Sequence, residues 1–264
     1  MDYTKMFDLS RKIAVVTGAS GLLGSELSFA LARCGADVVV VGRNMEKLKK
    51  ISDRIRAIHG KSSEMKVDVT NESDVKKLSS KVLERFGRID ILVACAGANI
   101  LGAAKNFRLE NWEKLMRINA QGTFLCNREI GKVMIDQNHG KIVNISSIRG
   151  WFATSASTLG YSASKASVNM ITRVLACEWA QFNINVNAVA PAMIATGMHT
   201  ATPDGEALKL DPKILEGVAR RTPMKRLAQP EDICGTVIFL ASEASAFITG
   251  QVIYVDGGAS VWAA

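Results

Sequence analysis

Short apolar runs alternate with longer amphipathic segments along most of this chain. A short apolar run bounded by turn residues is typical of a strand buried on both faces, and apolar residues recurring every three to four positions are typical of a helix. The predicted strands are residues 13–16, 38–41, 65–67, 89–94, 141–145, 184–189 and 251–255. The predicted helices are residues 22–33, 45–58, 73–86, 112–134, 161–181 and 230–241. Repeated strand–helix units predict an α/β fold, a doubly wound parallel sheet of about seven strands with helices on both faces.

One long stretch, residues 190–211, interrupts this alternation. It contains Gly197, Pro203, Asp204 and Gly205, which are residues that favour turns. We expect an irregular segment there and, with the residues that follow to about 225, a flap over a site. No repeat, low-complexity tract or linker divides the chain, so residues 1–264 are predicted to form a single domain.

Composition places the chain among soluble globular proteins. Of its 264 residues, 48% are hydrophobic and 22% are charged. The chain contains no run of about 18 apolar residues, so no membrane span is predicted. The first ten residues lack the apolar core of a signal peptide, and the five cysteines show no paired spacing. We therefore expect a cytoplasmic protein without a disulfide framework or a metal site.

The formal net charge of +8 has two explanations. One is a surface that binds nucleic acid, and the other is a solvated surface that also attracts anionic cofactors. Lysines and arginines are spread along the chain without aromatic residues between them and without a nucleic-acid-binding motif. The second explanation is favoured.

The turn after the first predicted strand is rich in glycine. It reads Thr-Gly-Ala-Ser-Gly-Leu-Leu-Gly over residues 17–24 and opens a helix. Glycines there permit a tight turn and close helix–sheet packing, and the amino end of the helix offers N–H groups to a pyrophosphate. This placement predicts a Rossmann-type dinucleotide site. Its candidate residues are Gly18, Ser20, Gly21, Leu22, Leu23 and Gly24.

The end of the second strand sets the choice between the two nicotinamide dinucleotides. An acidic residue there would bind the adenosine ribose hydroxyls of NAD, but this chain has Arg43 and Asn44. An arginine can pair with a 2′-phosphate, so NADP(H) is favoured over NAD(H); the alternative is a solvated arginine. Asp68 and Val69 follow the third strand, where Asp68 could bind the adenine amino group or cap a helix.

Tyr161 and Lys165 stand four residues apart in a predicted helix, so both side chains leave the same face. The pair Ser146-Ser147 ends the fifth predicted strand, and Ser147 lies fourteen residues before the tyrosine. A fixed ammonium group favours the ionised phenol, so we expect a lowered pKa for Tyr161. A hydroxyl beside it could hold a carbonyl or alcohol oxygen. This is the chemistry that hydride transfer at a carbon–oxygen bond requires.

These motifs together resemble the single-domain form of the short-chain dehydrogenase/reductase family. The resemblance extends from Leu9 to Gly258. Within the family, the chain is similar to gluconate 5-dehydrogenase and 3-oxoacyl-carrier-protein reductase members. It rests on the motifs at Thr17-Gly18 through Gly24, Asp68, Ala96-Gly97, Asn119, Ser147, Tyr161, Lys165, Pro191, Thr196 and residues 255–258.

The resemblance implies the following roles. Tyr161 is the general acid/base, Lys165 binds the nicotinamide ribose and lowers the tyrosine pKa, and Ser147 positions the substrate oxygen. Ser147 rather than Ser146 matches the family's serine because Ile148-Arg149-Gly150 follows it. Asn119 holds a water next to the lysine. The remaining cofactor contacts are expected from Asp68, Val69, Ala96, Gly97, Pro191, Ile194 and Thr196.

Three positions differ from the family pattern. Leu22 replaces the middle glycine of the first turn, Cys95 replaces the asparagine before Ala96-Gly97, and Ala192 replaces the glycine after Pro191. None of these changes removes a catalytic group. Cys95 is expected to be a small buried hydrophobe.

The substrate is a small molecule whose pocket we expect to include Ser147, Arg149, Trp151, Met193 and His199. Arg149 could face a carboxylate and His199 a hydroxyl, or both could point to solvent. A sugar, polyol or sugar acid is the first choice. A 3-oxoacyl thioester or a broad range of carbonyl compounds is the alternative, and a catalytically silent cofactor sensor is a remote one. The family resemblance also implies a homotetramer.

Overall fold

The computed structural model describes residues 3–153, 157–195, 200–201, 207–208 and 211–262. Seven parallel strands form its main sheet in the order β10-β7-β6-β4-β1-β2-β3. These strands are β1 (Ile13–Thr17), β2 (Asp37–Gly42), β3 (Ser62–Lys66), β4 (Ile91–Ala94), β6 (Gly140–Ile145), β7 (Ile184–Pro191) and β10 (Val252–Val255). The predicted doubly wound, Rossmann-type α/β fold is confirmed.

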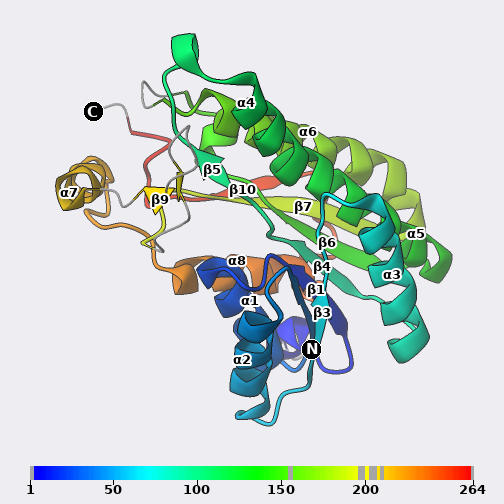
Figure 1. Ribbon diagram of the computed structural model, residues 1–264. Coiled ribbons are helices and arrows are strands. Elements are labelled where there is room, and N and C mark those ends of the chain that lie inside the picture. The colour runs from blue at the N-terminus through cyan, green and yellow to red at the C-terminus, as the bar shows by residue number, and fades with distance from the viewer. Residues whose placement is uncertain (1–2, 154–156, 196–199, 202–206, 209–210, 263–264) are drawn as a thin grey trace.

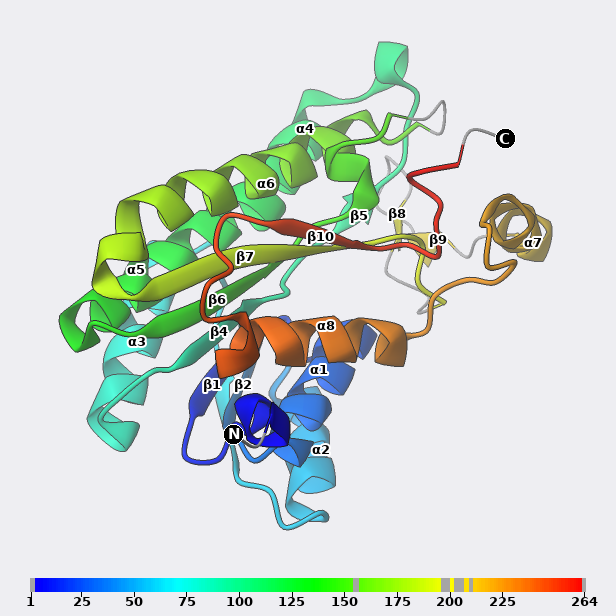
Figure 2. The same cartoon turned by 180° about the vertical axis from the view of Figure 1, so that it is seen from behind.

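Helices cover both faces of the sheet (Figures 1 and 2). One layer contains α1 (Leu22–Arg33), α2 (Met45–Arg56) and α8 (Pro230–Ala241). The other contains α3 (Glu72–Phe86), α5 (Gly122–Gln137) and α6 (Leu159–Trp179). Alternate residues of β2 enter different cores, because Val38 and Val40 pack toward the first layer and Val39 and Val41 toward the second. Burial on both faces explains why this strand is a continuous apolar run.

The strand order reverses between β1 and β4. The chain winds outward from β1 through β2 to β3, returns to β4 beside β1, and then winds the other way to β6, β7 and β10. At such a reversal the helices that follow the two neighbouring strands lie on opposite faces, so a crevice opens at the carboxyl ends of the strands. This crevice is where a ligand of the fold binds.

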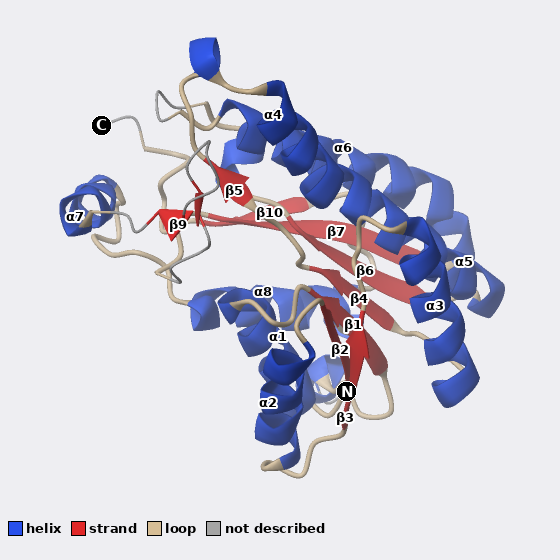
Figure 3. Ribbon diagram, in the orientation of Figure 1, coloured by secondary structure: helices blue, strands red, loops and turns tan. Residues whose placement is uncertain are grey.

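Smaller elements stand at the carboxyl ends of the strands (Figure 3). A three-stranded sheet joins β5 (Asn99–Ile100), β8 (Thr200–Ala201) and β9 (Ala207–Leu208). The expected irregular stretch therefore contains short strands, and it is followed by a helix that was not predicted, α7 (Pro212–Arg221). The start of α7 carries a readable signal, because Asp211 caps it by accepting from Lys213 N at 2.8 Å and proline occupies the first turn.

The helix predicted at residues 112–134, with Gly122 interrupting it, is divided at that position. It consists of α4 (Leu109–Leu115), a π-helical turn at Met116–Gln121, and α5. Gly122 is needed after that turn, because a Cβ there would lie 2.9 Å from Val69 Cγ2. Thr123 Oγ1 donates to the carbonyl oxygen of Asn119 at 2.7 Å, within the turn. A π turn inside a helix commonly marks a functional position, and this one contains Asn119.

The third strand was predicted too late in the chain. It pairs Ser62 and Ser63 with Val38 and Val39, at the edge of the sheet. An edge strand is only partly covered, so its polar residues produce no apolar run. The described 3₁₀ segments are Tyr3–Phe7, Ala104–Asn106, Ile148–Gly150, Ala180–Phe182 and Glu243–Ser245.

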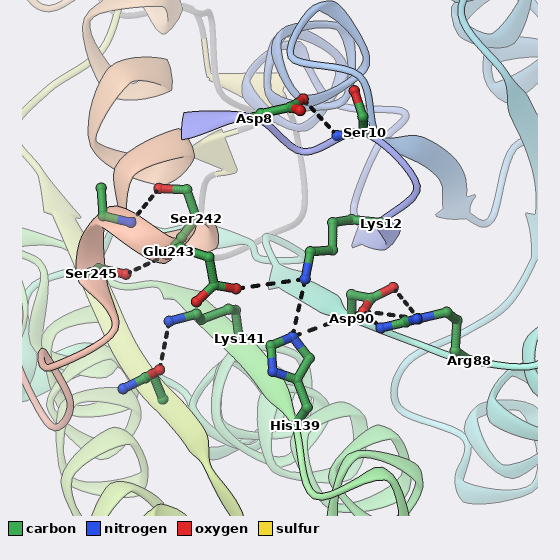
Figure 4. Close-up of polar contacts among 12 residues, drawn as sticks. Asp8, Ser10, Lys12, Arg88, Asp90, His139, Lys141, Ser242, Glu243 and Ser245 are labelled. Atoms are coloured by element: carbon green, nitrogen blue, oxygen red, sulfur yellow. Dashed lines mark hydrogen bonds and ion pairs between the residues drawn. The ribbon is translucent and has the colours of Figure 1, made fainter. Parts of the chain in front are cut away.

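A polar cluster ties the strands together at their amino ends, opposite the crevice (Figure 4). The buried Asp90 carboxylate accepts from Ile13 N at 2.8 Å and from Arg88 Nε at 2.9 Å, so it links β1 to the start of β4. Lys12 Nζ lies 3.4 Å from His139 Nε2 and 3.6 Å from a Glu243 oxygen. Since an ammonium group can only donate, His139 accepts in this contact and is neutral.

Burial lowers the pKa of His139 below its ordinary value of 6.5, and the Lys12 and Lys141 ammonium groups lower it further, whereas Glu243 and Asp90 oppose them. The unfolded chain therefore takes up this proton at a higher pH than the folded chain. We predict that the free energy of unfolding falls as the pH drops below about 6.5 and that this part of the fall is missing in His139→Gln. Urea unfolding at pH 7.5 and 5.5 measures the difference.

The exposed His59 provides the matched control for this experiment. His59→Asn suits its positive φ of 61°, and this variant should keep the wild-type pH dependence. An equal pH dependence in His139→Gln and the wild type would show that His139 does not titrate differently on folding.

Candidate active site

The first βα turn passes very close to the end of β4. Gly18 has φ +68°, and a Cβ on it would lie 2.7 Å from both N and Cα of Ala96. A side chain at Gly24 would overlap the carbonyl group of Gly18. Both glycines are therefore required by geometry, as predicted for a turn that brings backbone close to a pyrophosphate.

The amino end of α1 is open to an anion. Its N-cap residue is Gly21, which has no side chain to cap the N–H groups of the first turn. Leu22 projects outward and is 63% exposed, so the leucine that replaces the usual glycine does not fill the turn. The helix dipole and the uncapped N–H groups of residues 22 and 23 suit a pyrophosphate.

Three residues predicted to bind the cofactor lie at the adenosine end of the crevice. Arg43 is exposed directly after β2, and Ser20 lies against Gly42 at the end of that strand. Asn44 Oδ1 accepts from Lys47 N at 3.0 Å and caps α2, and the cofactor contact of Asn44 stays a prediction.

Asp68 does not cap a helix, which was one of the two roles the sequence left open, because the N-cap of α3 is Asn71. Asp68 Oδ1 accepts from Thr70 N at 2.9 Å and from Thr70 Oγ1 at 2.8 Å. Asp68 also lines a cavity of about 340 Å³ together with Arg43 and residues of α4. The side chain of Val69 packs in the core and does not line this cavity.

Tyr161 and Lys165 lie on one face of α6, as the spacing predicts, and both are buried. Lys165 Nζ lies 5.9 Å from the centre of the Tyr161 ring and donates to the carbonyl oxygen of Ile145 at 2.7 Å. Ile145 is the last residue of β6. The ammonium group therefore joins the active face of α6 to the carboxyl end of β6.

The two serines after β6 have different environments. Ser146 Oγ donates to Asn169 Oδ1 at 2.5 Å, so its hydroxyl is used to hold α6. Ser147 Oγ accepts from Arg149 N at 3.2 Å and is also hydrogen-bonded to Tyr161. Of the two, Ser147 is the hydroxyl that faces the phenol, which agrees with the motif-based choice.

The pKa values differ from the simple expectation. Burial raises the pKa of Tyr161, while the hydrogen bond to Ser147 and the Arg149 guanidinium act to lower it. Lys165 is not among the groups that lower it, so the predicted cause is corrected here. Burial lowers the pKa of Lys165 itself to about 8. A lysine with that pKa can exchange a proton close to neutral pH.

Asn119 holds the loop after β4. Its amide accepts from Ala98 N at 2.8 Å and donates to Ala98 O at 2.9 Å and to Ser164 Oγ at 2.9 Å. A Cβ on Gly97 would lie 3.3 Å from Asn119 Oδ1 and 3.6 Å from Lys165 Nζ. The asparagine thus lies at the lysine, while its expected contact with water stays a prediction.

Thr17 is a site residue that the motif analysis did not assign a role. Its buried Oγ1 accepts from Cys95 N at 3.2 Å and from Ala96 N at 3.3 Å. These bonds tie the end of β1 to the loop after β4, at the position where the family pattern has an asparagine and this chain has Cys95. Its position directly before Gly18 was the available signal. Cys95 is partly buried, not fully buried as predicted, and desolvation raises the pKa of its thiol to about 11, so the thiol is neutral.

The predicted substrate residues separate into three groups. Arg149 is partly buried and lies within electrostatic reach of Tyr161 and Arg221, whereas Trp151 is 64% exposed. Met193 and Ile194 pair with Ala228, just after Pro191 completes β7. Thr196 and His199 lie outside the described residues.

Two other kinds of feature are missing from the described part of the chain. No helix there is both long and apolar enough to cross a membrane. No group of three or more His, Cys, Asp or Glu residues there is arranged to hold a metal ion.

Comparisons with known proteins agree with this geometry. A family model described as "Enoyl-(Acyl carrier protein) reductase" matches residues 18–260. Gluconate 5-dehydrogenase of Gluconobacter oxydans is 35% identical over 261 residues, with 99% of each chain covered. The 3-oxoacyl-[acyl-carrier-protein] reductase of Thermotoga maritima is 34% identical over 250 residues, with 95% of this chain and 98% of the relative covered.

A solved structure shares the whole fold. The crystal structure of a gluconate 5-dehydrogenase from Burkholderia cenocepacia, in complex with NADP and tartrate, superposes with a TM-score of 0.92. It is 32% identical and covers 99% of this chain and 100% of that one.

Proposed function

We propose that this chain, which belongs to the short-chain dehydrogenase/reductase family, transfers a hydride between NADP(H) and the secondary alcohol or ketone of a sugar, polyol or sugar acid. Family membership makes it a nicotinamide-dependent oxidoreductase. The observation that carries the proposal is the meeting of Tyr161, Ser147 and Lys165 at the sheet edge that also holds the dinucleotide turn.

Tyr161 is proposed to move the proton that accompanies hydride transfer. The nicotinamide, when bound, supplies or accepts the hydride. Ser147 Oγ, hydrogen-bonded to the phenol, is placed to hold the substrate oxygen as its charge changes. Since burial raises the tyrosine pKa, the phenol is protonated at neutral pH and is ready to act as the acid in ketone reduction.

Lys165 is proposed to bind the nicotinamide ribose and to return a proton toward Tyr161. The Lys165 pKa of about 8 suits that exchange. Asn119 holds the loop after β4, which lies beside Lys165. Ala96, Gly97, Pro191 and Ile194 are proposed cofactor contacts at the carboxyl ends of β4 and β7, with Thr196 beyond them.

We predict that Tyr161→Phe lowers kcat by about two to four orders of magnitude and leaves the Kd for NADPH within about twofold, because only the proton donor is lost. Steady-state assays and fluorescence titration of NADPH measure the two quantities. Ser146→Ala is the matched control: it removes a hydroxyl that bonds Asn169 and not the phenol, so it should retain most of the turnover. Near-normal turnover in Tyr161→Phe would remove the tyrosine from its role.

The preference for NADP(H) is proposed from Arg43. No carboxylate follows β2, and the exposed guanidinium stands beside the cavity at the adenosine end. The Burkholderia relative was crystallised with NADP, which supports a nicotinamide dinucleotide of this kind. A guanidinium–phosphate pair is a strong, charge-assisted contact.

We predict that Arg43→Ala raises the Kd for NADPH by about tenfold or more and changes the Kd for NADH by less than about twofold. Titration of the purified protein with each dinucleotide measures both. A loss shared equally by NADPH and NADH would contradict phosphate recognition by Arg43.

The preference for a polyhydroxy acid is proposed from the polar groups on the substrate side. Arg149 follows the catalytic serine, and its charge reaches Tyr161. Burial lowers the pKa of Arg149, as does the nearby Arg221, while Tyr161 raises it. A partly buried guanidinium group within electrostatic reach of Tyr161 favours an anionic substrate such as a carboxylate.

A second polar group agrees with a hydroxylated substrate. Asn99 Oδ1 is a buried oxygen without a hydrogen-bond partner among the described residues. It lies in β5, beside Ala98, which Asn119 holds. A buried acceptor without a partner costs free energy that a substrate hydroxyl would recover. Reduction of a 3-oxoacyl thioester is the alternative, supported by the relative from Thermotoga maritima.

We predict that the wild type reduces 5-ketogluconate with NADPH at higher kcat/KM than acetoacetyl-CoA, and that Arg149→Gln raises KM about tenfold or more for the acid and far less for a neutral keto sugar such as fructose. If the substitution also changes Tyr161, it changes the rates with both substrates equally, so the comparison between the two substrates isolates the effect on the carboxylate. Absorbance at 340 nm measures the rates. An equal loss for both substrates, or a preference for the thioester, would contradict the proposed substrate class.

We further propose a homotetramer in the cytoplasm, with residues 1–264 as a single domain and residues 190–225 as a flap over the substrate. Phe124 on α5 and Met170 and Val174 on α6 are exposed apolar residues on neighbouring helices, and Val261 and Trp262 are exposed near the carboxyl end. A second copy would cover such patches in a symmetric assembly. Light scattering tests the assembly, and a monomer would contradict it.

A further inference from the structure

A cavity of about 340 Å³ lies where β2 and β3 end against α4. Arg43 lines it after β2, and Asp68 and Thr70 line it after β3. Lys114 of α4 and Arg117 of the π turn line its other side. The cavity therefore lies between two groups of cations that are far apart in the sequence.

These three cations lack acidic partners. Within the described residues, Arg43, Lys114 and Arg117 have no carboxylate within 4.0 Å. Glu110 and Glu113 stand four residues before Lys114 and Arg117, a spacing at which helical ion pairs commonly form, yet neither pair is made. Glu110 instead bonds Arg108, so the donors of Lys114 and Arg117 are not used by these two glutamates.

The acidic groups at the cavity are only partly available to neutralise it. Asp68 Oδ1 already accepts two hydrogen bonds from Thr70, and Glu110 is paired with Arg108, whereas Glu113 lines the cavity without an ion pair among the described residues. Gathering cations around one space costs free energy unless an anion enters. A phosphate monoester carries close to two negative charges and accepts from several donors at once.

We infer that Lys114 and Arg117 form the second half of a clamp on the 2′-phosphate of NADP(H), opposite Arg43. This inference rests on the proposed preference for NADP(H), and it assigns specificity to α4 in addition to the strand end. Arg43 alone is a single exposed side chain. A phosphate held from two sides would be shielded from water and would discriminate more strongly against a ribose hydroxyl.

The backbone that carries Arg117 is held in advance. Asn119, two residues later in the same π turn, is bonded through its side chain to Ala98 and Ser164. Thr123 also donates to its carbonyl oxygen. Ordering Arg117 over a phosphate would therefore cost only side-chain entropy, which favours binding.

The test uses adenosine 2′,5′-bisphosphate and 5′-AMP, which differ in the 2′-phosphate and need no turnover. Calorimetric titration gives the Kd of each probe for the wild type and for Arg117→Gln, Lys114→Gln and Arg43→Gln. Each variant should raise the Kd for the bisphosphate by about five- to tenfold and change the Kd for 5′-AMP by less than about twofold. Lys81→Gln, an equal charge change on the exposed face of α3 outside the cavity, should leave both probes unchanged.

The outcomes distinguish the clamp from the proposed preference for NADP(H) on which it rests. If Arg43→Gln weakens the bisphosphate but Lys114→Gln and Arg117→Gln behave like Lys81→Gln, the clamp is wrong and the NADP(H) preference stands. If the wild type binds both probes equally, the preference itself is wrong and the clamp falls with it. If 5′-AMP weakens as much as the bisphosphate in Arg117→Gln, the residue supports adenosine or local structure and not the 2′-phosphate.

Discussion

The hydrogen bond from the buried Lys165 ammonium group to the carbonyl oxygen of Ile145 holds the active site together. A buried ammonium group is costly unless it is bonded, so α6 must remain against the end of β6. Ser147 lies two residues beyond Ile145, and Tyr161 lies one helical turn before Lys165. One contact therefore places both the hydroxyl and the phenol, and the tyrosine–serine hydrogen bond follows from it.

Glycines at the crevice allow the backbone segments to approach one another closely. Gly18 lets β1 approach the loop after β4, and Gly97 lies within a few ångströms of both Asn119 and Lys165. Gly150 permits the segment after Ser147 to lie on α6, since a Cβ there would be 2.8 Å from the carbonyl oxygen of Lys165. A close backbone approach of this kind presents N–H groups to a ligand and keeps the catalytic side chains at fixed separations.

The two ends of the sheet use charge in opposite ways. At the amino ends, Asp90 pairs with Arg88 and Glu243 pairs with Lys12, so charge there serves stability. At the carboxyl ends, charged groups of both signs line the adenosine cavity, and Arg43, Lys114 and Arg117 make no ion pair there among the described residues. Charge at this end of the sheet is therefore available to a ligand.

The sequence alone determined the fold class, the glycine-rich turn after β1 and the candidate residues for proton transfer. Strand burial and helix spacing are local patterns, and Gly18, Tyr161 and Lys165 have chemistries that few other residues share. The tertiary structure decided the rest. It showed that Asn44 caps a helix, that Thr17 ties β1 to β4, that a π turn divides the long helix, and that burial rather than Lys165 sets the direction of the Tyr161 pKa. The Asn44 cap is a local contact with Lys47, but asparagine at that position could equally have faced the cofactor. Thr17 bonds residues 78 and 79 positions away, and the Tyr161 pKa depends on desolvation. Neither of these two properties is written in a local pattern.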